Sequence, residues 1–258
     1  MLLEVDSIFM NFGGIAALKG ISFSVPEGQV VSVIGPNGAG KTTLFNIVTG
    51  FQKPTAGQVR FDGAVVTGLL PHAIAKHGLI RTFQKTEVFP ALTVMECVRI
   101  GLLNNFQPSL FSVLIGKAEV AAFVKNSALD VAYILEMVGL QSKSEYLAQE
   151  LSYGEQRLLE IAVGLAARPR LLLLDEPSSG LNAEESARFS TLVRRLQKQK
   201  ITIVLVEHNM NVVMGVSDQI IVVHHGEKIA EGTPEAVSQN RDVIRAYLGR
   251  EWVTDAVG

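Results

Sequence analysis

Short apolar runs near the start of the chain predict β-strands. Three runs rich in β-branched residues lie at residues 2–5, 21–25 and 30–34. A turn sequence, Pro26-Glu27-Gly28, separates the last two runs, and so short a connection favours an antiparallel pair. We therefore expect the strands at 21–25 and 30–34 to pair with each other near the N-terminus.

Two later runs have the uniformly apolar character of strands that are covered on both faces. They occupy residues 171–174 and 201–206. Between them, apolar residues recur at helical spacing among basic ones, which predicts an amphipathic helix: Phe189, Leu192, Val193 and Leu196. A buried strand, a helix and a second buried strand in succession predict a parallel α/β sheet.

The last part of the pattern predicts a closing hairpin. Residues 219–223 and 228–230 form its strands, and His225-Gly226 forms its turn. The chain has no repeat, low-complexity tract or flexible linker. We therefore expect a single domain over residues 1–258.

The middle of the chain differs from the rest. Residues 87–155 are richer in helix formers and contain no convincing buried strand, so we expect a helical insertion there. The α/β core is then expected in residues 1–86 and 156–258, with the helical subdomain in residues 87–155.

Composition narrows the classes of protein that remain. The chain has 258 residues, with 23 Lys and Arg against 25 Asp and Glu. This balance excludes a strongly basic nucleic-acid binder and an acidic disordered tail. A mean hydropathy of +0.28 is high, but polar residues interrupt the longest uncharged stretch, 100–116, so no membrane span is predicted. The single Cys97 fits a reducing compartment, and the acidic Glu4 and Asp6 make a cleaved signal unexpected.

A glycine-rich segment follows the run at 30–34 and matches the phosphate-loop pattern G-x-x-x-x-G-K-[ST]. Its backbone N–H groups would surround phosphate at a helix N-terminus, Lys41 would reach the β- and γ-phosphates, and the Thr42 hydroxyl would bind Mg²⁺. The alternative is a glycine turn that only joins a strand to a helix. The candidate residues are Gly35, Pro36, Asn37, Gly38, Ala39, Gly40, Lys41, Thr42 and Thr43.

Two acidic residues end the apolar run at 171–174. Asp175 and Glu176 would lie at the carboxyl edge of the sheet, where ligands of open α/β sheets bind. Asp175 would hold Mg²⁺ through its water shell, and Glu176 would orient or activate the attacking water. The alternative is a solvated acidic turn that leads into Pro177.

A capping sequence precedes the acidic strand. Ser152 and Glu155 have the spacing of a capping box, in which each side chain binds the other residue's backbone N–H. The helix that follows is expected to bury Leu158, Ile161, Ala162 and Leu165. An ordinary helix start would explain this pattern, but a helix N-terminus with Ser152 and Gly154 is also a site for an anion.

Taken in order, the phosphate loop, Gln84, Ser152, Asp175-Glu176 and His208 resemble the ATP-binding subunit of ABC transporters over nearly the whole chain. The resemblance implies an α/β fold: a P-loop NTPase (RecA-like) core with an N-terminal antiparallel β-subdomain and a helical subdomain insertion. It also implies a head-to-tail dimer. In that dimer Ser152, Gly154 and Glu155 of one subunit close over ATP held by the phosphate loop of the other.

The same resemblance assigns roles to three further residues. Gln84 would contact the metal or the attacking water and transmit nucleotide occupancy to membrane subunits. His208 would contact the γ-phosphate, and Phe12 would stack on adenine. Each has a plainer alternative: a loop amide for Gln84, a strand-end histidine bonded to backbone for His208, and core packing for Phe12. His224-His225 has no evident third metal ligand, so we interpret the pair as turn residues.

Two departures from the family pattern stand out. Tyr153 and Glu155 replace the Gly and Gln of the commonest signature, and Asn182 replaces an Asp that many relatives carry. Within the family, segments 12–18, 81–84 and 243–249 are most similar to branched-chain amino acid importers, and a long insertion around 102–120 is also similar. Relatives that move urea or lipopolysaccharide share several of these features.

The resemblance implies a cytoplasmic ATPase, peripheral on the inner face of the plasma membrane, with ATP and Mg²⁺ as cofactors. Its expected partners are a second cassette (identical or different), transmembrane permease subunits and, indirectly, an extracytoplasmic solute-binding protein, with no nucleic acid. The alternatives are a urea or amide importer, a lipopolysaccharide exporter, or a non-transport regulatory cassette. Regulatory cassettes usually have tandem cassettes or coiled-coil insertions, which are missing here. A scaffold that binds ATP without hydrolysis is disfavoured by Glu176 and His208.

Overall fold

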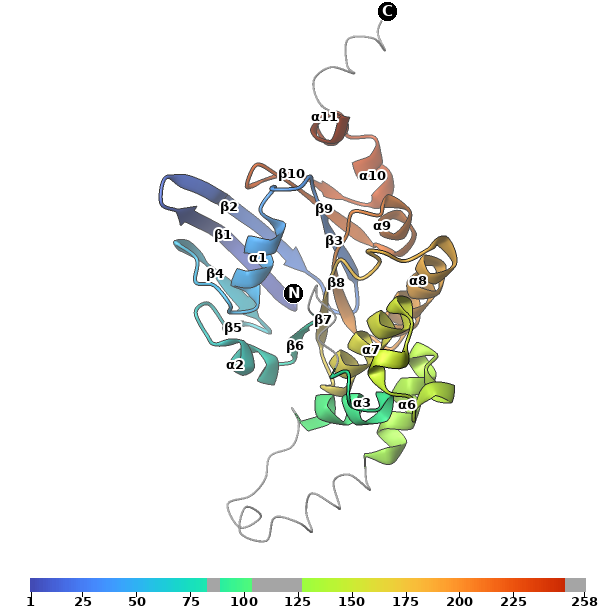
Figure 1. The fold of residues 1–258 in the computed structure, drawn as a ribbon. Helices are drawn as coiled ribbons and strands as arrows, with labels where there is room; N and C mark the ends of the chain where they lie inside the picture. The colour runs from blue at the N-terminus through green and yellow to red at the C-terminus, as the bar shows by residue number, and fades with distance from the viewer. Residues whose placement is uncertain (83–88, 104–126, 249–258) are drawn as a thin grey trace, which may run out of the picture.

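The computed structural model describes residues 1–82, 89–103 and 127–248. Two sheets and a layer of helices make up this part of the chain (Figure 1). The four-stranded sheet has the order β2-β1-β4-β5 and the six-stranded sheet the order β10-β9-β3-β8-β7-β6. The strands are β1 (Leu3–Phe12), β2 (Ile15–Val25), β3 (Val30–Ile34), β4 (Ala56–Phe61), β5 (Ala64–Val65), β6 (Leu79–Arg81), β7 (Leu171–Asp175), β8 (Thr202–Val206), β9 (Gln219–His224) and β10 (Glu227–Gly232).

Helices cover both sheets and form a separate layer beside the larger one (Figure 1). Helix α1 lies between the two sheets, whereas α3, α6, α7 and α8 lie on the other side of the six-stranded sheet. The helices are α1 (Lys41–Val48), α2 (Pro71–Lys76), α3 (Val94–Leu102), α6 (Ala128–Val138), α7 (Tyr153–Ala166), α8 (Ala183–Lys198), α9 (Met210–Val216), α10 (Pro234–Ser238) and α11 (Arg241–Leu248), with short 3₁₀ turns η2 (Gln141–Lys143) and η3 (Ala148–Glu150).

The expected pairing of the strands at 21–25 and 30–34 is wrong. Strand β2 pairs antiparallel with β1, whereas β3 belongs to the other sheet and lies parallel between β8 and β9. The burial patterns explain the difference. All five residues of β3 are buried, as in a strand covered on both faces, whereas β2 ends in alternating buried and half-buried positions. The turn at Pro26-Glu27-Gly28 therefore carries the chain from one sheet to the other.

The predicted parallel unit and the closing hairpin are both present. Strands β7 and β8 pair in parallel from Leu171↔Thr202 to Asp175↔Val206, and α8 connects them with its four predicted apolar residues buried. Strands β9 and β10 pair antiparallel. Their turn has φ of 49° at His225 and 80° at Gly226, the two positive values that a type I′ hairpin turn requires.

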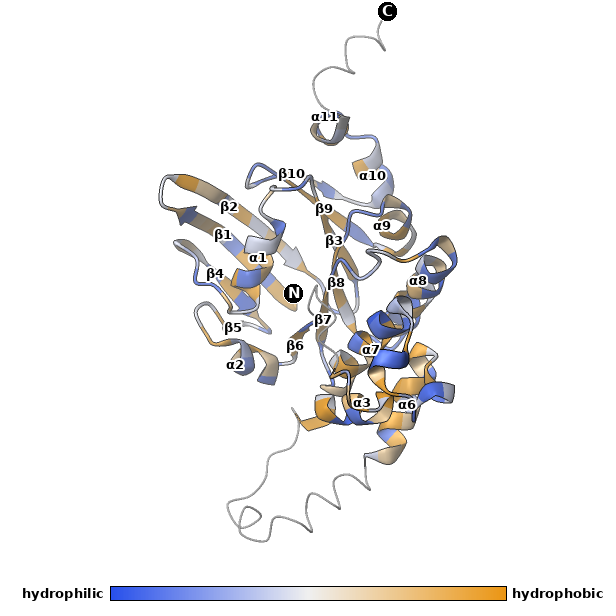
Figure 2. Cartoon of the chain, viewed as in Figure 1, coloured by the Kyte–Doolittle hydropathy of each residue, from blue (hydrophilic) through white to orange (hydrophobic). Residues whose placement is uncertain are grey.

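Alternate residues of the six-stranded sheet supply two apolar cores. Leu172 and Leu174 of β7 face the core beneath the helical layer, whereas Leu171 and Leu173 face the core that contains α1 and the smaller sheet. Burial of each such side chain contributes roughly 1.5–3 kcal/mol. Apolar residues predominate in α3 and α6 (Figure 2). This sheet is therefore a rigid base for the loops at its carboxyl edge.

The helical layer is built on α7, which packs against both α3 and α6. The expected boundary between residues 155 and 156 falls in the first turn of α7, and the division into core and helical subdomain stays a prediction. None of the helices in residues 1–82, 89–103 and 127–248 has the length and apolar character needed to cross a bilayer.

Candidate functional site

The phosphate loop joins the central strand β3 to helix α1. Two of its glycines are needed because other strands approach the loop closely. A Cβ at Gly35 would lie 2.0 Å from the carbonyl oxygen of Val223 in β9, and one at Gly40 would lie 2.8 Å from that of Ala17 in β2. Larger residues at either position would displace backbone. The loop is therefore fixed in shape by both sheets, which a simple connecting turn would not require.

Lys41 is held inside this loop. Its Nζ donates to the carbonyl oxygens of Gly35 at 2.6 Å and Pro36 at 3.0 Å. Burial lowers the pKa of Lys41, and the charges of Glu176 and Asp175 act in the opposite direction. The structure thus brings the phosphate loop and the acidic strand end, which are far apart in sequence, into one electrostatic environment.

Asp175 ends β7 and forms a buried ion pair that the sequence analysis did not anticipate. Arg81, the last residue of β6, donates to Asp175 Oδ2 at 2.6 Å, and the two side chains are only 8% and 3% exposed. The other terminal nitrogen of Arg81 donates to Asn46 Oδ1 of α1 at 2.8 Å. Arg81 therefore links the carboxylate to the helix that follows the phosphate loop. The sequence signal for this ion pair is a basic residue at a strand end, three positions before Gln84.

Glu176 has an uncommon backbone conformation. Its φ is +49°, and its N–H donates to the carbonyl oxygen of Val206, the last residue of β8, at 2.9 Å. Non-glycine residues in this left-handed region cost free energy and often occur at functional sites. The bond to β8 means that the backbone at Glu176 is fixed by two adjacent strands.

The donor set suits Mg²⁺ bound together with a nucleotide. Thr42 in the first turn of α1 offers a hydroxyl and Asp175 a carboxylate, and Mg²⁺ prefers such oxygen ligands. Within the described ranges, no group of three or more His, Cys, Asp or Glu residues could hold a metal. Gln84, the other predicted metal contact, lies outside the described residues.

Helix α7 begins with the predicted capping box. Glu155 N–H donates to Ser152 Oγ at 3.3 Å, and Ser152 N–H donates to Glu155 Oε2 at 3.0 Å. Lys143 Nζ also donates to Glu155 Oε1 at 2.6 Å. Burial alone would raise the pKa of Glu155, but the bonds from Lys143 and Ser152 lower it below its usual value. Both carboxylate oxygens of Glu155 thus serve the helix start, and its contact with nucleotide stays a prediction.

The expected burial along α7 needs one correction. Leu158 is only partly buried, whereas its neighbour Leu159 is fully buried. Ile161, Ala162 and Leu165 are buried as expected.

Tyr153 gives the unusual signature a structural role. A Cβ at Gly180 would lie 2.9 Å from the Tyr153 ring, so the ring packs on the loop that follows Glu176. Arg157 donates to the Tyr153 hydroxyl at 2.8 Å and lies 5.2 Å from the ring centre. Tyr153 therefore connects the start of α7 to the acidic loop within one subunit.

Asn182, the second departure, caps helix α8. Its Oδ1 accepts a hydrogen bond from Glu185 N–H at 2.9 Å, and Glu185 Oε2 accepts from Asn182 N–H at 2.9 Å. Asn is among the preferred residues at this position.

His208 and Phe12 lie where they are accessible. The side chain of His208 is exposed just beyond β8. Phe12 ends β1 and is 47% exposed, which is against the core-packing alternative. His225 lies in the β9–β10 turn as expected, whereas His224 is the last residue of β9 and pairs with Glu227. Their ring centres are 4.0 Å apart.

A parallel sheet with a glycine loop after its central strand, Lys41 inside that loop and an acidic residue at a neighbouring strand end define a P-loop nucleotide-binding ATPase. The comparisons with known proteins narrow this class. The family model described as "ABC transporter" matches residues 18–179. The chain therefore belongs to the ABC transporter family, as an ATP-binding subunit. A second family model, "Branched-chain amino acid ATP-binding cassette transporter", matches residues 227–253.

Individual relatives span almost the whole chain. The high-affinity branched-chain amino acid transport ATP-binding protein BraF of Pseudomonas aeruginosa is 43% identical, over 96% of this chain and 98% of its own. LivG of Escherichia coli, which has the same description, is 42% identical over the same shares. The crystal structure of a nucleotide-free ATP-binding cassette from an ABC transporter superposes with a TM-score of 0.82 at 32% identity, over 96% of this chain and 99% of that one. A dimeric cassette bound to ADP and Pi gives 0.74 at 26% identity, over 90% and 98%.

Proposed function

We propose that this chain is the ATP-binding subunit of an ABC importer and hydrolyses ATP to drive uptake of branched-chain amino acids. The observation that carries the proposal is the geometry of the phosphate loop: Lys41 is bonded to the carbonyl oxygens of Gly35 and Pro36 at the end of β3, in the same sheet as β7, which ends in Asp175. The names of the relatives and the second family model support the choice of solute.

The chain's own residues divide the chemistry between them. Residues 35–43 would bind the phosphates through backbone N–H groups and Lys41. Thr42 and Asp175 would hold Mg²⁺, which when bound neutralises phosphate charge. Glu176 would orient the attacking water, and His208 would contact the γ-phosphate. Phe12 would stack on the adenine ring.

A second cassette completes the site in this proposal. Ser152 is exposed at the N-terminus of α7, where backbone N–H groups favour an anion, and Gly154 is buried in the first turn beside Glu185. The dimeric cassette among the structural relatives supports an assembly of two such chains. We place the γ-phosphate of ATP bound to one subunit against this helix start of the other.

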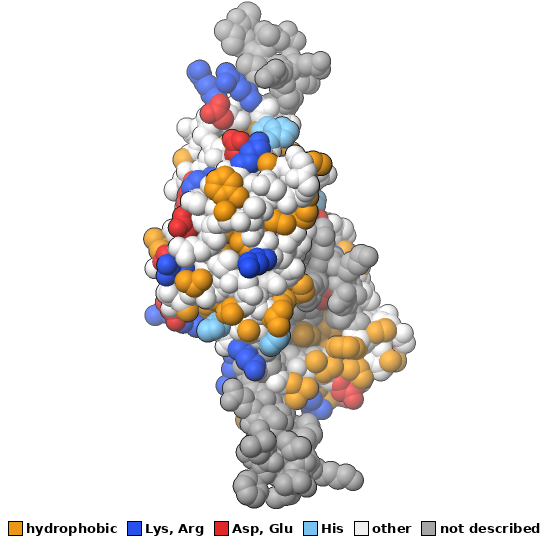
Figure 3. Space-filling model, turned by 90° about the vertical axis from the view of Figure 1, so that its left-hand side faces the viewer, with side chains coloured by type: hydrophobic (Ala, Val, Ile, Leu, Met, Phe, Trp, Pro, Cys, Tyr) orange, Lys and Arg blue, Asp and Glu red, His pale blue; other side chains and the backbone are white. Residues whose placement is uncertain are grey.

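The permease contact belongs on the side of α2. The face formed by the smaller sheet and α2 shows several exposed apolar side chains (Figure 3), among them Phe51, Leu69 and Leu70. A hollow beside them is lined by Phe51, Pro71, His72 and Arg81 among others. Because Arg81 also pairs with Asp175, a subunit docked there lies one residue from the metal site. The chain would then be peripheral on the inner face of the membrane, beneath permeases served by an extracytoplasmic binding protein.

Three measurements test the proposed function. Purified chain should release phosphate from ATP in the presence of Mg²⁺, and affinity-tagged chain should co-purify with membrane permeases. The solute-binding protein of the same system should bind leucine, isoleucine or valine. Co-purification with ribosomes or DNA, or a binding protein specific for urea, would contradict the assignment.

A capped-helix comparison tests the role of Ser152. Both Ser152→Ala and Thr93→Ala remove a complete capping box, at α7 and α3 respectively. Each should lower the free energy of unfolding by about 1 kcal/mol in a urea titration. Only Ser152→Ala should also lower ATP hydrolysis, by at least about tenfold, equivalent to about 1.4 kcal/mol. Equal activities in the two variants would show that Ser152 does no more than cap its helix.

A further inference from the structure

A fully buried carboxylate lies directly beyond strand β8. Glu207 is 0% exposed, and its side chain accepts hydrogen bonds from three backbone N–H groups. Ser178 donates to Oε1 at 2.7 Å. His208 and Asn209 donate to Oε2 at 3.0 Å and 3.1 Å. One side chain thus joins the loop that follows β7 to the loop that follows β8.

In the proposed function, these two loops carry Glu176, which orients the attacking water, and His208, which contacts the γ-phosphate of ATP. Ser178 comes two residues after Glu176, and His208 is itself bound by Glu207. The strands hold the loops together only as far as the pairing of Asp175 with Val206 and the bond from Glu176 N–H to the Val206 carbonyl. Beyond that point, the link through Glu207 continues the connection.

We propose that Glu207 is a positioning residue that fixes the separation of Glu176 and His208. This inference rests on the proposed function, because it assigns Glu207 a role in the same hydrolysis. Each carboxylate oxygen of Glu207 binds a different loop: Oε1 binds the loop after β7, and Oε2 binds the loop after β8. All three partners are N–H donors, so both oxygens must act as acceptors. A misplacement of about 1 Å in a catalytic group costs on the order of 100-fold in rate, so a loss of either link should reach the chemistry.

Glu207→Gln is the direct test. The amide keeps the size of the side chain but replaces one acceptor oxygen with a donor NH₂ group, which must then face a backbone N–H. We expect kcat for ATP hydrolysis to fall by at least about tenfold. The KM for ATP should stay within about twofold, because none of the described hydrogen bonds of Glu207 involves residues 35–43.

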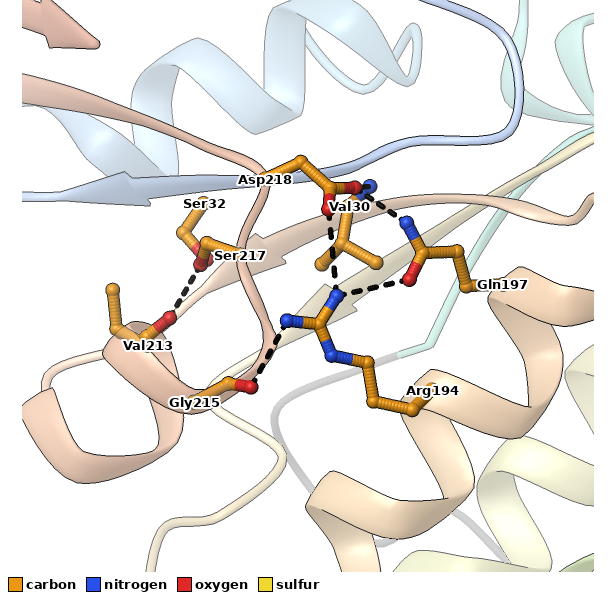
Figure 4. Close-up of polar contacts among 8 residues, drawn as sticks. All are labelled: Val30, Ser32, Arg194, Gln197, Val213, Gly215, Ser217 and Asp218. Atoms are coloured by element: carbon orange, nitrogen blue, oxygen red, sulfur yellow. Dashed lines mark hydrogen bonds and ion pairs between the residues drawn. The ribbon is translucent and has the colours of Figure 1, made fainter. Parts of the chain in front are cut away.

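Asp218 offers a matched control at the opposite edge of the same sheet (Figure 4). Its Oδ2 accepts the N–H of Val30, the first residue of β3, at 2.8 Å, and Gln197 and Arg194 also bind this carboxylate. Asp218→Asn makes the same acid-to-amide change in a carboxylate that also accepts a hydrogen bond from a backbone N–H, that of Val30. It should lower the urea midpoint as Glu207→Gln does, and leave kcat unchanged.

The outcomes separate the two proposals. If wild type and Asp218→Asn release no phosphate, the proposed function fails. If wild type and Asp218→Asn are active, two results for Glu207→Gln overturn the positioning role. One is an unchanged kcat, and the other is a loss of kcat together with a loss of affinity for ATP. Should Glu207→Gln not fold, amide hydrogen exchange of the wild-type chain decides: the inference requires slow exchange at Ser178, His208 and Asn209, and fast exchange at Ser178 and His208 overturns it.

Discussion

Replacement of Glu176 by glutamine should leave ATP binding intact and lower phosphate release by roughly 100- to 10,000-fold, the usual contribution of a positioned acid or base. Binding depends on the backbone and Lys41 of the phosphate loop, which the substitution does not change. The carboxylate of Glu176, by contrast, is the group proposed to orient the attacking water. Phosphate release and equilibrium binding of an ATP analogue, measured on purified protein, check the two parts separately.

Glu184→Gln is the matched control for this prediction. Glu184 is in the first turn of α8 and 75% exposed, so the same chemical change there should leave hydrolysis unaltered. Wild-type turnover in pure Glu176→Gln protein would refute the assignment of Glu176. Loss of nucleotide binding would show instead that Glu176 supports the phosphate loop.

Arg81→Ala should lower the free energy of unfolding by about 3–5 kcal/mol, the cost of leaving one member of a buried ion pair uncompensated. The substitution removes the Arg81 partner of the Asp175 carboxylate in a site that is 3% exposed, and Asn46 loses its hydrogen bond from Arg81. A urea titration measures the change.

The control is an exposed pair of the same chemistry. Arg188 binds Glu184 at 2.6 Å, with the two side chains 71% and 75% exposed. Arg188→Ala should change stability by no more than about 1 kcal/mol. An effect of Arg81→Ala as small as that of Arg188→Ala would mean that water or a neighbouring group compensates Asp175, and the pair would not be a buried link.

Most of the correct structural predictions from the sequence come from local patterns. The phosphate loop, the amphipathic helix α8, the capping box of α7 and the hairpin β9–β10 each depend on residues close together in the chain. The family model and the structural relatives confirm the fold class that these motifs indicated. In each case the spacing of a few residues already determines the geometry.

Features that depend on distant residues were missed or misassigned. The turn at 26–28 says nothing about whether β3 pairs with its neighbour in sequence or with β8 and β9. The links of Arg81 to Asp175 and of Glu207 to Ser178 also join separate strand ends. The signal for each link is a charged residue at or just after the end of an apolar strand, and its partner can be identified only once the strand order is known.

The departures in the signature have a similar explanation. Tyr153 looked like a loss of the usual glycine, but its ring packs on Gly180, a partner 27 positions along the sequence. Glu155 keeps its carboxylate bound to Ser152 and Lys143. Both residues therefore support the shape of the helix start, against which the proposed function places the γ-phosphate of ATP bound to the neighbouring subunit.

The pairing of two subunits around ATP is tested most directly by the mass in solution of the Glu176→Gln chain, which should hold ATP without consuming it. With ATP and Mg²⁺ the mass should rise from that of one chain to that of two. Addition of Ser152→Ala to the same chain should return it to the mass of one. A mass that stays at one chain under saturating ATP, or a dimer that forms equally well without Ser152, would contradict the account.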